Sequence, residues 1–210
     1  MEKYYKERAP IYDKVYLYPE REKDIKFLKE YIPSRFKGLD IIEIAAGTGY
    51  WTQYVSATAK TILATDAVEE PLEELKRRRL PDSVSIVKQD AYSLDSIDQL
   101  FNGAFAGLWL SHVPKQKIKM FFIGLHRLLE PGSKVIFIDN SKSQCIRFPI
   151  TRKDKFGNGY QERTLDNGSA HEVLKNFPSE MELNGYLINI AENINYIELE
   201  HFWLIEYRKK

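Results

Sequence analysis

The feature that most constrains the fold is an ordered alternation of short apolar runs with amphipathic stretches between Leu39 and Asp139. The apolar runs are rich in β-branched or aromatic residues and are bounded by Gly, Asp or Ser, as expected of buried strands. There are five of them: 39–45, 61–65, 84–88, 104–110 and 134–139. Parallel strands need long crossover connections, which are usually helices. The alternation therefore predicts an α/β fold with a mostly parallel sheet.

The segments around these runs carry helical spacing of apolar residues. One helix is predicted over 68–79, with Pro71 tolerated in its first turn, and another over 115–129. A third apolar pattern precedes the first strand, over 25–32, and is expected to stop at Pro33.

Beyond Asp139 the alternation ends and the pattern predicts smaller units. The segment Asp166–Ser169 lies between two alternating stretches and predicts a β-hairpin. Ser179, followed three residues later by Glu182, forms a capping-box pattern that predicts a helix over 179–192. Two final apolar runs predict an antiparallel strand pair: 195–199 and 201–208.

Charge and cysteine content exclude several protein classes. Lys plus Arg total 31 against 30 for Asp plus Glu, so a net charge of +1 offers no broad basic surface for nucleic acid or anionic membrane. A single cysteine, Cys145, excludes an internal disulfide framework and a Cys-rich metal site. The start of the chain lacks the apolar core of a signal peptide. We expect a cytoplasmic protein that binds no metal, nucleic acid or membrane, and the oligomeric state stays open.

The strongest chemical signal is a glycine turn after the first apolar run, in the segment Glu43–Gly49. Small residues let a ligand approach the backbone closely, and the following helix N-terminus offers free N–H groups. A dinucleotide fingerprint would need a third glycine where Thr52 stands. This difference counts against a nicotinamide-dependent oxidoreductase. That enzyme class and a non-catalytic cofactor-binding module both stay open as alternatives.

Acidic residues end the second and third apolar runs. Asp66 lies about 20 positions after Gly47, where a carboxylate can accept hydrogen bonds from both hydroxyls of a ribose. Asp90 could accept from the exocyclic amine of adenine, and Ala67 and Ala91 are small enough to flank its ring. Each acid could serve as a helix N-cap instead. Their joint occurrence favours a nucleoside site.

In these features the sequence resembles the class I S-adenosylmethionine-dependent methyltransferases over roughly residues 39–139. The resemblance implies a Rossmann-like fold, with a mostly parallel seven-stranded sheet, an antiparallel edge strand and helices on both faces. It implies S-adenosylmethionine as cofactor and S-adenosylhomocysteine as product. Gly47 and Gly49 would lie under the methionine part, Asp66 would hold the ribose and Asp90 the adenine. It also implies cofactor contacts for Tyr12, Glu43, Ala45, Ala67, Ala91 and Leu110.

The resemblance divides one methyltransferase domain, 1–210, into four parts. They are an N-terminal lid and helix (1–33), a cofactor-binding core (39–139), a cap insertion (145–176) with a hairpin over 160–175, and a C-terminal helix with strands (177–210). Tyr12 and Tyr18 of the lid are expected at the cofactor and the substrate respectively. A plain amphipathic helix packing on the sheet is the alternative for this segment.

The acceptor side carries WLSHVP at 109–114 in place of the Asn/Asp-Pro-Pro-Tyr/Phe tetrad of many amino-methylating enzymes. His112 could act as a general base, donate a hydrogen bond to an anionic acceptor, or be a loop histidine bonded to backbone. This segment and RTLDNGSAHEVLK resemble the phosphonate O-methyltransferases of the kind found in dehydrophos biosynthesis. There an Arg and a Lys of the cap hairpin grip the substrate anion, and the matching positions are Arg163 and Lys175. The resemblance implies O-methylation of a small anionic molecule, phosphonate-like or carboxylate-like, although both charges could simply be solvated.

The length of the hairpin loop decides whether Arg163 and Lys175 can share a site, because strand side chains alternate between faces. A two-residue Asn167–Gly168 turn places them on opposite faces. A three-residue loop over 166–168, with Gly168 in the left-handed region, pairs Arg163 with His171 and brings Arg163 and Lys175 to one face. A bulge elsewhere in the hairpin, or a strand that ends before Lys175, would also let the two share a site.

Overall fold

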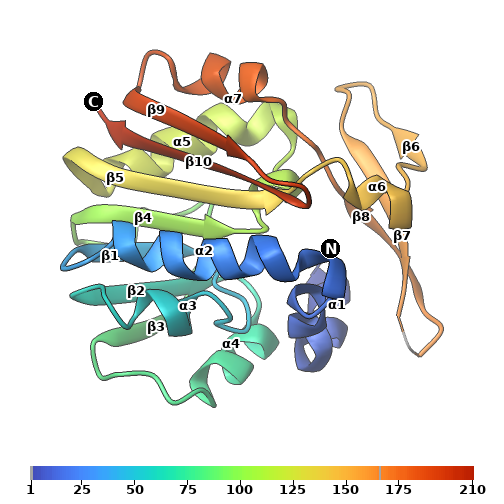
Figure 1. Cartoon of the computed structure of the whole chain (residues 1–210), viewed down its shortest axis with the longest axis horizontal. Coiled ribbons are helices and arrows are strands. Elements are labelled where there is room, and N and C mark those ends of the chain that lie inside the picture. The colour runs from blue at the N-terminus through green and yellow to red at the C-terminus, as the bar shows by residue number, and fades with distance from the viewer. Residues whose placement is uncertain (1, 166) are drawn as a thin grey trace.

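The computed structural model describes residues 2–165 and 167–210 and centres on a seven-stranded sheet of order β3-β2-β1-β4-β5-β10-β9 (Figure 1). Its strands are β1 (Asp40–Ile44), β2 (Thr61–Asp66), β3 (Val84–Lys88), β4 (Phe101–Gly107), β5 (Leu129–Asn140), β9 (Ala191–Glu198) and β10 (Phe202–Lys209). Strands β1 to β5 are parallel, and β10 runs antiparallel to both neighbours, one place in from the edge. The Rossmann-like fold class is confirmed.

Helices cover both faces of the sheet (Figure 1). One face carries α2 (Glu22–Arg35), α3 (Thr52–Val55) and α4 (Glu69–Lys76), and the other carries α5 (Ile118–Arg127) and α7 (Glu180–Leu187). Side chains along β5 alternate between the two apolar cores: Phe137 packs with α5, whereas Ile136 and Ile138 pack with α2. Within the described ranges, no helix is long and apolar enough to cross a bilayer.

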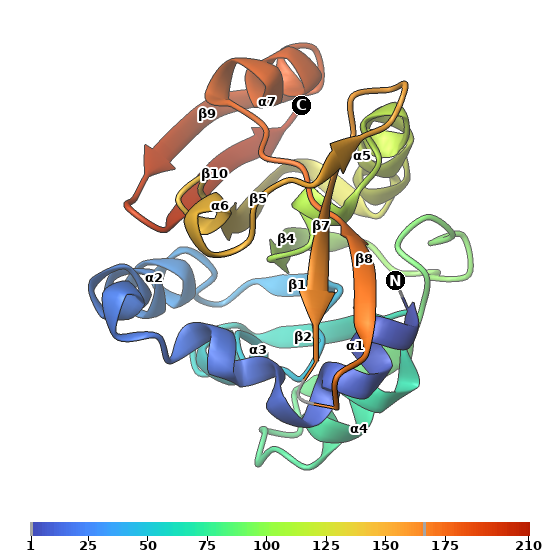
Figure 2. The same ribbon diagram turned by 90° about the vertical axis from the view of Figure 1, so that its right-hand side faces the viewer.

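Two additions lie at the carboxyl ends of the parallel strands (Figure 2). The N-terminal segment comprises α1 (Glu2–Arg8) and two 3-10 helices, Ala9–Tyr16 and Pro19–Arg21. The cap follows β5 and contains α6 (Gln144–Arg147) and a second sheet of order β6-β7-β8, made of Arg152–Lys153, Gly159–Thr164 and Ala170–Leu174. In Figure 2, β7 and β8 cross in front of the main sheet and α1 lies beside them. The two additions touch through the rings of Tyr4 and His171.

Several predicted helix boundaries are wrong: α4 ends at Lys76 and not at 79, and α5 spans Ile118–Arg127 within the predicted range 115–129. Helix α2 continues past Pro33 to Arg35, because proline near the helix end removes little of the hydrogen-bond ladder and the amide of Phe36 still donates to the Pro33 carbonyl at 3.2 Å. The helix predicted over 179–192 ends at Leu187, and the chain enters β9 at Ala191. The capping box of this helix is present as predicted.

The fourth strand begins and ends earlier than the predicted range 104–110. It spans Phe101–Gly107, and Leu108 then adopts φ +55°, which takes the chain out of the ladder and into a 3-10 helix over Leu110–His112. A left-handed conformation is uncommon for leucine and concentrates at functional sites.

Candidate functional site

A cavity of about 250 Å³ opens at the carboxyl ends of β1 to β4 and is roofed by the N-terminal segment. Parallel strands bring their carboxyl ends to one edge, and ligands of open α/β sheets bind there. Eight of the ten residues that the sequence assigns to the cofactor line this cavity: Tyr12, Glu43, Ala45, Gly47, Asp66, Ala67, Asp90 and Ala91.

The carboxylate of Asp66 organises the glycine turn. Its oxygens accept hydrogen bonds from the amides of Gly47 and Val68, each at 2.9 Å. Burial raises the pKa of Asp66, and these backbone donors oppose that rise. Gly47 has φ +58°, a conformation that glycine adopts at little cost. The turn is thus held open with a carboxylate at its side, as a ribose site requires.

Two residues assigned to the cofactor lie elsewhere. Gly49 has φ +76° and packs under α4, where an added Cβ would come 2.8 Å from Cγ of Leu75. Leu110 is buried in the apolar core that contains α5, and Leu108 and Trp109 line the cavity in its place. The reason is the left-handed turn at Leu108, which changes the direction of the side chains that follow.

Glu43 is almost fully buried at the end of β1 and lines the same cavity. Its carboxyl oxygen accepts a hydrogen bond from the hydroxyl of Thr52 at 2.7 Å, and burial raises its pKa to about 8. A cationic ligand group beside it would favour the ionised form and lower that pKa. Glu43 therefore suits a positively charged part of a ligand.

A second, smaller cavity of about 30 Å³ lies between the N-terminal segment and the cap. Four residues line both cavities: Tyr5, Tyr12, Leu108 and His112. The smaller cavity is also lined by the residues expected at the acceptor, Tyr18, Arg163 and Lys175. The two spaces thus meet at a shared wall, as a two-substrate reaction requires.

The register of the cap hairpin follows the three-residue alternative. Arg163 pairs with His171 and Thr164 with Ala170, and Gly168 has φ +80°. Asp166, the first residue of the predicted loop, lies outside the described residues. The odd loop sends Arg163 and Lys175 to one face, and both side chains are buried against the smaller cavity.

Comparisons with known proteins agree with this geometry. A family model described as a methyltransferase domain matches residues 41–132. The chain is similar to DhpI in complex with SAH, with a TM-score of 0.81 and 27% identity over 99% of this chain and 94% of that one. A complex of DhpI with SAM and HEP gives a TM-score of 0.80 and 27% identity, covering 98% and 94%.

Residues 41–132 match a methyltransferase domain, and the likeness to DhpI over nearly the whole chain supports a class I S-adenosylmethionine-dependent methyltransferase. The PH0226 protein of Pyrococcus horikoshii OT3 shares the fold, with a TM-score of 0.74 and 15% identity over 92% of this chain and 93% of that one. No curated protein shows a significant match. The methyltransferase uses S-adenosylmethionine, and Asp66, the Gly47 turn and Glu43 fit the ribose, the carboxylate end and the positive charge of that molecule.

His112 of the methyltransferase has defined roles for its two ring nitrogens. Nδ1 lies 2.6 Å from the carbonyl of Leu174 and must donate to it, which leaves Nε2 as the acceptor for the Tyr5 hydroxyl at 2.9 Å. Burial, with a contribution from the Lys175 charge, lowers the pKa of His112 to about 3. The imidazole is therefore neutral at physiological pH, and the Tyr5 hydroxyl occupies its Nε2 lone pair at the wall between the cavities.

The low pKa of His112 predicts how the rate of methyl transfer depends on pH. We expect methyl transfer to show no His112 titration between about pH 5 and 8, because the imidazole stays neutral throughout. The folded pKa lies below the unfolded value of about 6.5. The associated stability is therefore present above about pH 6.5 and is lost as the pH falls toward 3. A rate that rises with a midpoint near 6.5 in the wild type, and not in His112→Ala, would contradict this assignment.

Lys175 of the methyltransferase is paired inside the protein. Its Nζ donates to Oδ1 of Asp139 at 2.9 Å and to Oγ of Ser111 at 2.6 Å, and both charged side chains are almost fully buried. Burial pushes the pKa of Asp139 upward, but the ammonium of Lys175 outweighs it and the pKa lies below its ordinary value. Sequence reasoning missed this partner, although an acid at the end of the fifth apolar run is visible in the sequence.

Arg163 differs from Lys175, because none of the described carboxylates forms an ion pair with it. Its Nη2 donates to Oε1 of Gln161 at 2.6 Å, its guanidinium lies 3.5 Å from the centre of the Phe148 ring, and its Nε is buried with no partner among the described residues. Arg163 thus keeps free donors and an uncompensated charge at the smaller cavity.

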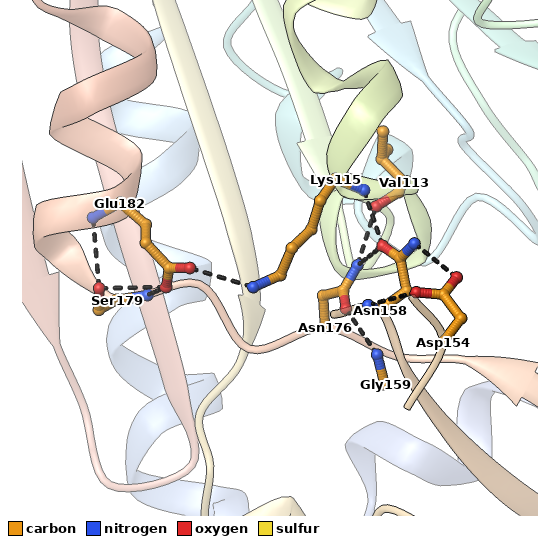
Figure 3. A network of polar contacts seen from close by, with 8 residues as sticks. All are labelled: Val113, Lys115, Asp154, Asn158, Gly159, Asn176, Ser179 and Glu182. Carbon is orange, nitrogen blue, oxygen red and sulfur yellow. Dashed lines mark hydrogen bonds and ion pairs between the residues drawn. The ribbon is translucent and has the colours of Figure 1, made fainter. Parts of the chain in front are cut away.

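A hydrogen-bond network fixes the base of the cap to the loop after His112 (Figure 3). The side chain of Asn176 donates to the Val113 carbonyl and to Oδ1 of Asn158, each at 3.1 Å, and accepts from the amide of Gly159 at 3.0 Å. Oδ1 of Asn158 also accepts from the amide of Lys115 at 2.8 Å. The cap and the loop that follows His112 are therefore held as one unit.

Tyr5, Arg8 and Arg21 also line the smaller cavity, and sequence reasoning did not single them out. Their only signal was the charged, Tyr-rich composition of the first 21 residues, which is equally typical of a surface helix.

Proposed function

We propose that the methyltransferase methylates an oxygen atom of a small acceptor that carries an anionic group, phosphonate-like or carboxylate-like. One observation carries this proposal: the larger cavity, which fits the cofactor, and the smaller cavity, which is lined by Arg163, share a wall. That wall is made of Tyr5, Tyr12, Leu108 and His112. An anion held by Arg163 in the smaller cavity would therefore lie next to the cofactor. The volume of about 30 Å³ favours a small group over a peptide or nucleobase.

Bound S-adenosylmethionine supplies an activated methyl group on its sulfonium sulfur. The work of the protein is then to orient an acceptor oxygen and to exclude water. A planar guanidinium such as that of Arg163 can grip one or two oxygens of an anion through charge-assisted hydrogen bonds. Another oxygen of the same group stays free to attack. The N-terminal segment closes the site from solvent.

The neutral state of His112 supports an acceptor that is already ionised. A histidine with a pKa of about 3 is a weak general base, since the efficiency of proton abstraction falls with the pKa of the base. A phosphonate or carboxylate oxygen needs no base. In this proposal the hydrogen bond from the Tyr5 hydroxyl to Nε2 of His112, at 2.9 Å, fixes both rings, and the rings shape the shared wall against which the acceptor lies.

The similarity to DhpI supports the same acceptor class. DhpI is seen in complex with SAH, and with SAM and HEP, and its likeness to this chain spans nearly the whole of both chains, which agrees with the sequence resemblance to phosphonate O-methyltransferases. The cofactor roles proposed with it are the ribose for Asp66 and the adenine for Asp90, which lies exposed at the cavity rim beside Ala91.

Methyl transfer from labelled S-adenosylmethionine to a panel of small molecules tests the proposal. The panel should pair alkylphosphonates and carboxylates with their neutral amides and alcohols. We expect labelled O-methyl esters from the anions and no product from the neutral partners. Equal transfer to the neutral partners, or labelled N-methyl products, would contradict it.

Arg163→Gln gives a matched mutational test. Removing one charge-assisted contact to the anion should raise KM for the acceptor about tenfold. Affinity for S-adenosylhomocysteine should not change, because Arg163 does not line the larger cavity. Arg127→Gln removes a surface arginine on α5 that pairs with Asp95 and serves as the control. An unaltered KM in folded Arg163→Gln would remove Arg163 from the acceptor site.

A further inference from the structure

Three arginines line the smaller cavity, and two of them come from the N-terminal segment. Arg8 lies 5.0 Å from the centre of the Tyr12 ring and donates to the hydroxyl of Tyr4 at 2.5 Å. Arg21 is buried and donates to the carbonyl of Val15 at 3.0 Å. Like Arg163, neither forms an ion pair with a side chain among residues 4–165 and 167–210, the side chains that the structure describes. Each guanidinium has five N–H donors, so each keeps donors for a ligand.

The charges around this cavity do not balance. Of the described residues that line it, none is Asp or Glu. Lys175 is compensated by Asp139 at 2.9 Å, and His112 is neutral. The arginines remain uncompensated, although Arg21 and Arg163 are each less than a tenth exposed. Burial lowers the pKa of Arg163, and the nearby charge of Arg8 adds to that effect.

Uncompensated buried charge costs free energy that an oppositely charged ligand recovers. A ligand with one negative charge leaves two of the three arginines unpaired, whereas a ligand with two negative charges leaves one unpaired. Because the cavity volume is only about 30 Å³, a ligand that carries both negative charges on one compact group fits it best.

We propose that Arg8 and Arg21 bind the anionic group of the acceptor together with Arg163, so that the site prefers a doubly charged group to a singly charged one of the same shape. The inference rests on the proposed function, because it assigns these arginines to the acceptor site. It gives the N-terminal segment a direct part in acceptor selection, beyond covering the cofactor.

Sulfate and methanesulfonate test the inference, because both are tetrahedral and neither can titrate in the working pH range, but only sulfate carries two charges. Their affinities are measured by calorimetry on the complex with S-adenosylhomocysteine. We expect wild type to bind sulfate about tenfold more tightly than methanesulfonate. Arg8→Gln should lower sulfate affinity about tenfold and remove most of the preference.

Arg21→Lys provides the second variant, since it keeps a positive charge at a buried position where glutamine could disturb folding. It loses the planar fork and should weaken sulfate binding more than methanesulfonate binding. Arg127→Gln again serves as the control and should match wild type. Thermal unfolding and affinity for S-adenosylhomocysteine show whether each variant is folded.

The outcomes separate this inference from the proposed function. Sulfate binding that depends on Arg163 but is unchanged in Arg8→Gln and Arg21→Lys would overturn the inference and leave the proposed function standing. An equal affinity of wild type for the two anions would also overturn it. Failure of every anion to bind wild type would overturn both.

Discussion

Lys175→Met should lower the free energy of unfolding by about 3–5 kcal/mol, because it leaves the Asp139 carboxylate buried without its counter-ion. Lys175 is 2% exposed and Asp139 is 0% exposed, so water cannot replace the lost ammonium. Chemical denaturation of wild type and variant at neutral pH measures the difference. A loss below about 1 kcal/mol would mean that the pair is solvated in solution.

The double variant Lys175→Met with Asp139→Asn is the matched control. Asparagine keeps an oxygen that can accept from the amide of Ser111, which now bonds to Asp139 at 2.9 Å, and it carries no charge. We expect the double variant to recover most of the lost stability, which a thermodynamic cycle expresses as a coupling energy. If both variants are equally unstable, packing and not charge explains the loss.

The same double variant separates two roles of Lys175. An ammonium that serves mainly as the partner of Asp139 positions the cap and the Ser111 loop, and its loss with Asp139 should alter KM for the acceptor little. If the ammonium binds the acceptor directly, its loss should raise KM for the acceptor even in a stable double variant. KM for the acceptor in the double variant, compared with Arg163→Gln, decides between these roles.

The pH dependence of stability follows from the same pair. The folded-state pKa of Asp139 is depressed, so its contribution is present above the unfolded value of about 3.9 and is lost as the pH falls through the folded pKa. In wild type this loss belongs to the acid limb of the stability curve. The double variant should lack it.

Asp66→Ala should weaken the binding of S-adenosylmethionine and S-adenosylhomocysteine about 10- to 100-fold. Loss of a charge-assisted hydrogen bond costs about 1.5–3 kcal/mol, and a factor of ten corresponds to about 1.4 kcal/mol. The alanine also frees the amides of Gly47 and Val68, which the carboxylate now holds at 2.9 Å. Calorimetry with S-adenosylhomocysteine measures the effect without turnover.

Asp66→Asn distinguishes the two contributions. One amide oxygen can still accept from a backbone amide, but the negative charge is gone, so an intermediate affinity is expected. Asp90→Ala should have a smaller effect, because Asp90 is exposed at the rim and water can replace it. Full cofactor affinity in folded Asp66→Ala would remove the proposed ribose contact.

The five parallel strands could be predicted from local patterns in the sequence, and the resemblance to the methyltransferases implied a cofactor site where they end. Each strand is an apolar run, and parallel strands must carry Gly47, Asp66 and Asp90 to the same edge. The hairpin around Gly168 could be reduced to two alternatives for the same reason, since side chains alternate along a strand. Local sequence did not choose between them.

The acceptor side was decided by tertiary structure. Lys175 meets Asp139, 36 positions away, and Tyr5 meets His112, 107 positions away, and no sequence period specifies such contacts. Arg8 and Arg21 likewise line the same small cavity only because the N-terminal segment packs against the cap. The apolar pattern of a strand depends only on neighbouring residues in the sequence. The sequence alone therefore identified the fold and the edge of the sheet where the cofactor site lies. Charge compensation depends on neighbours that only the folded chain brings together.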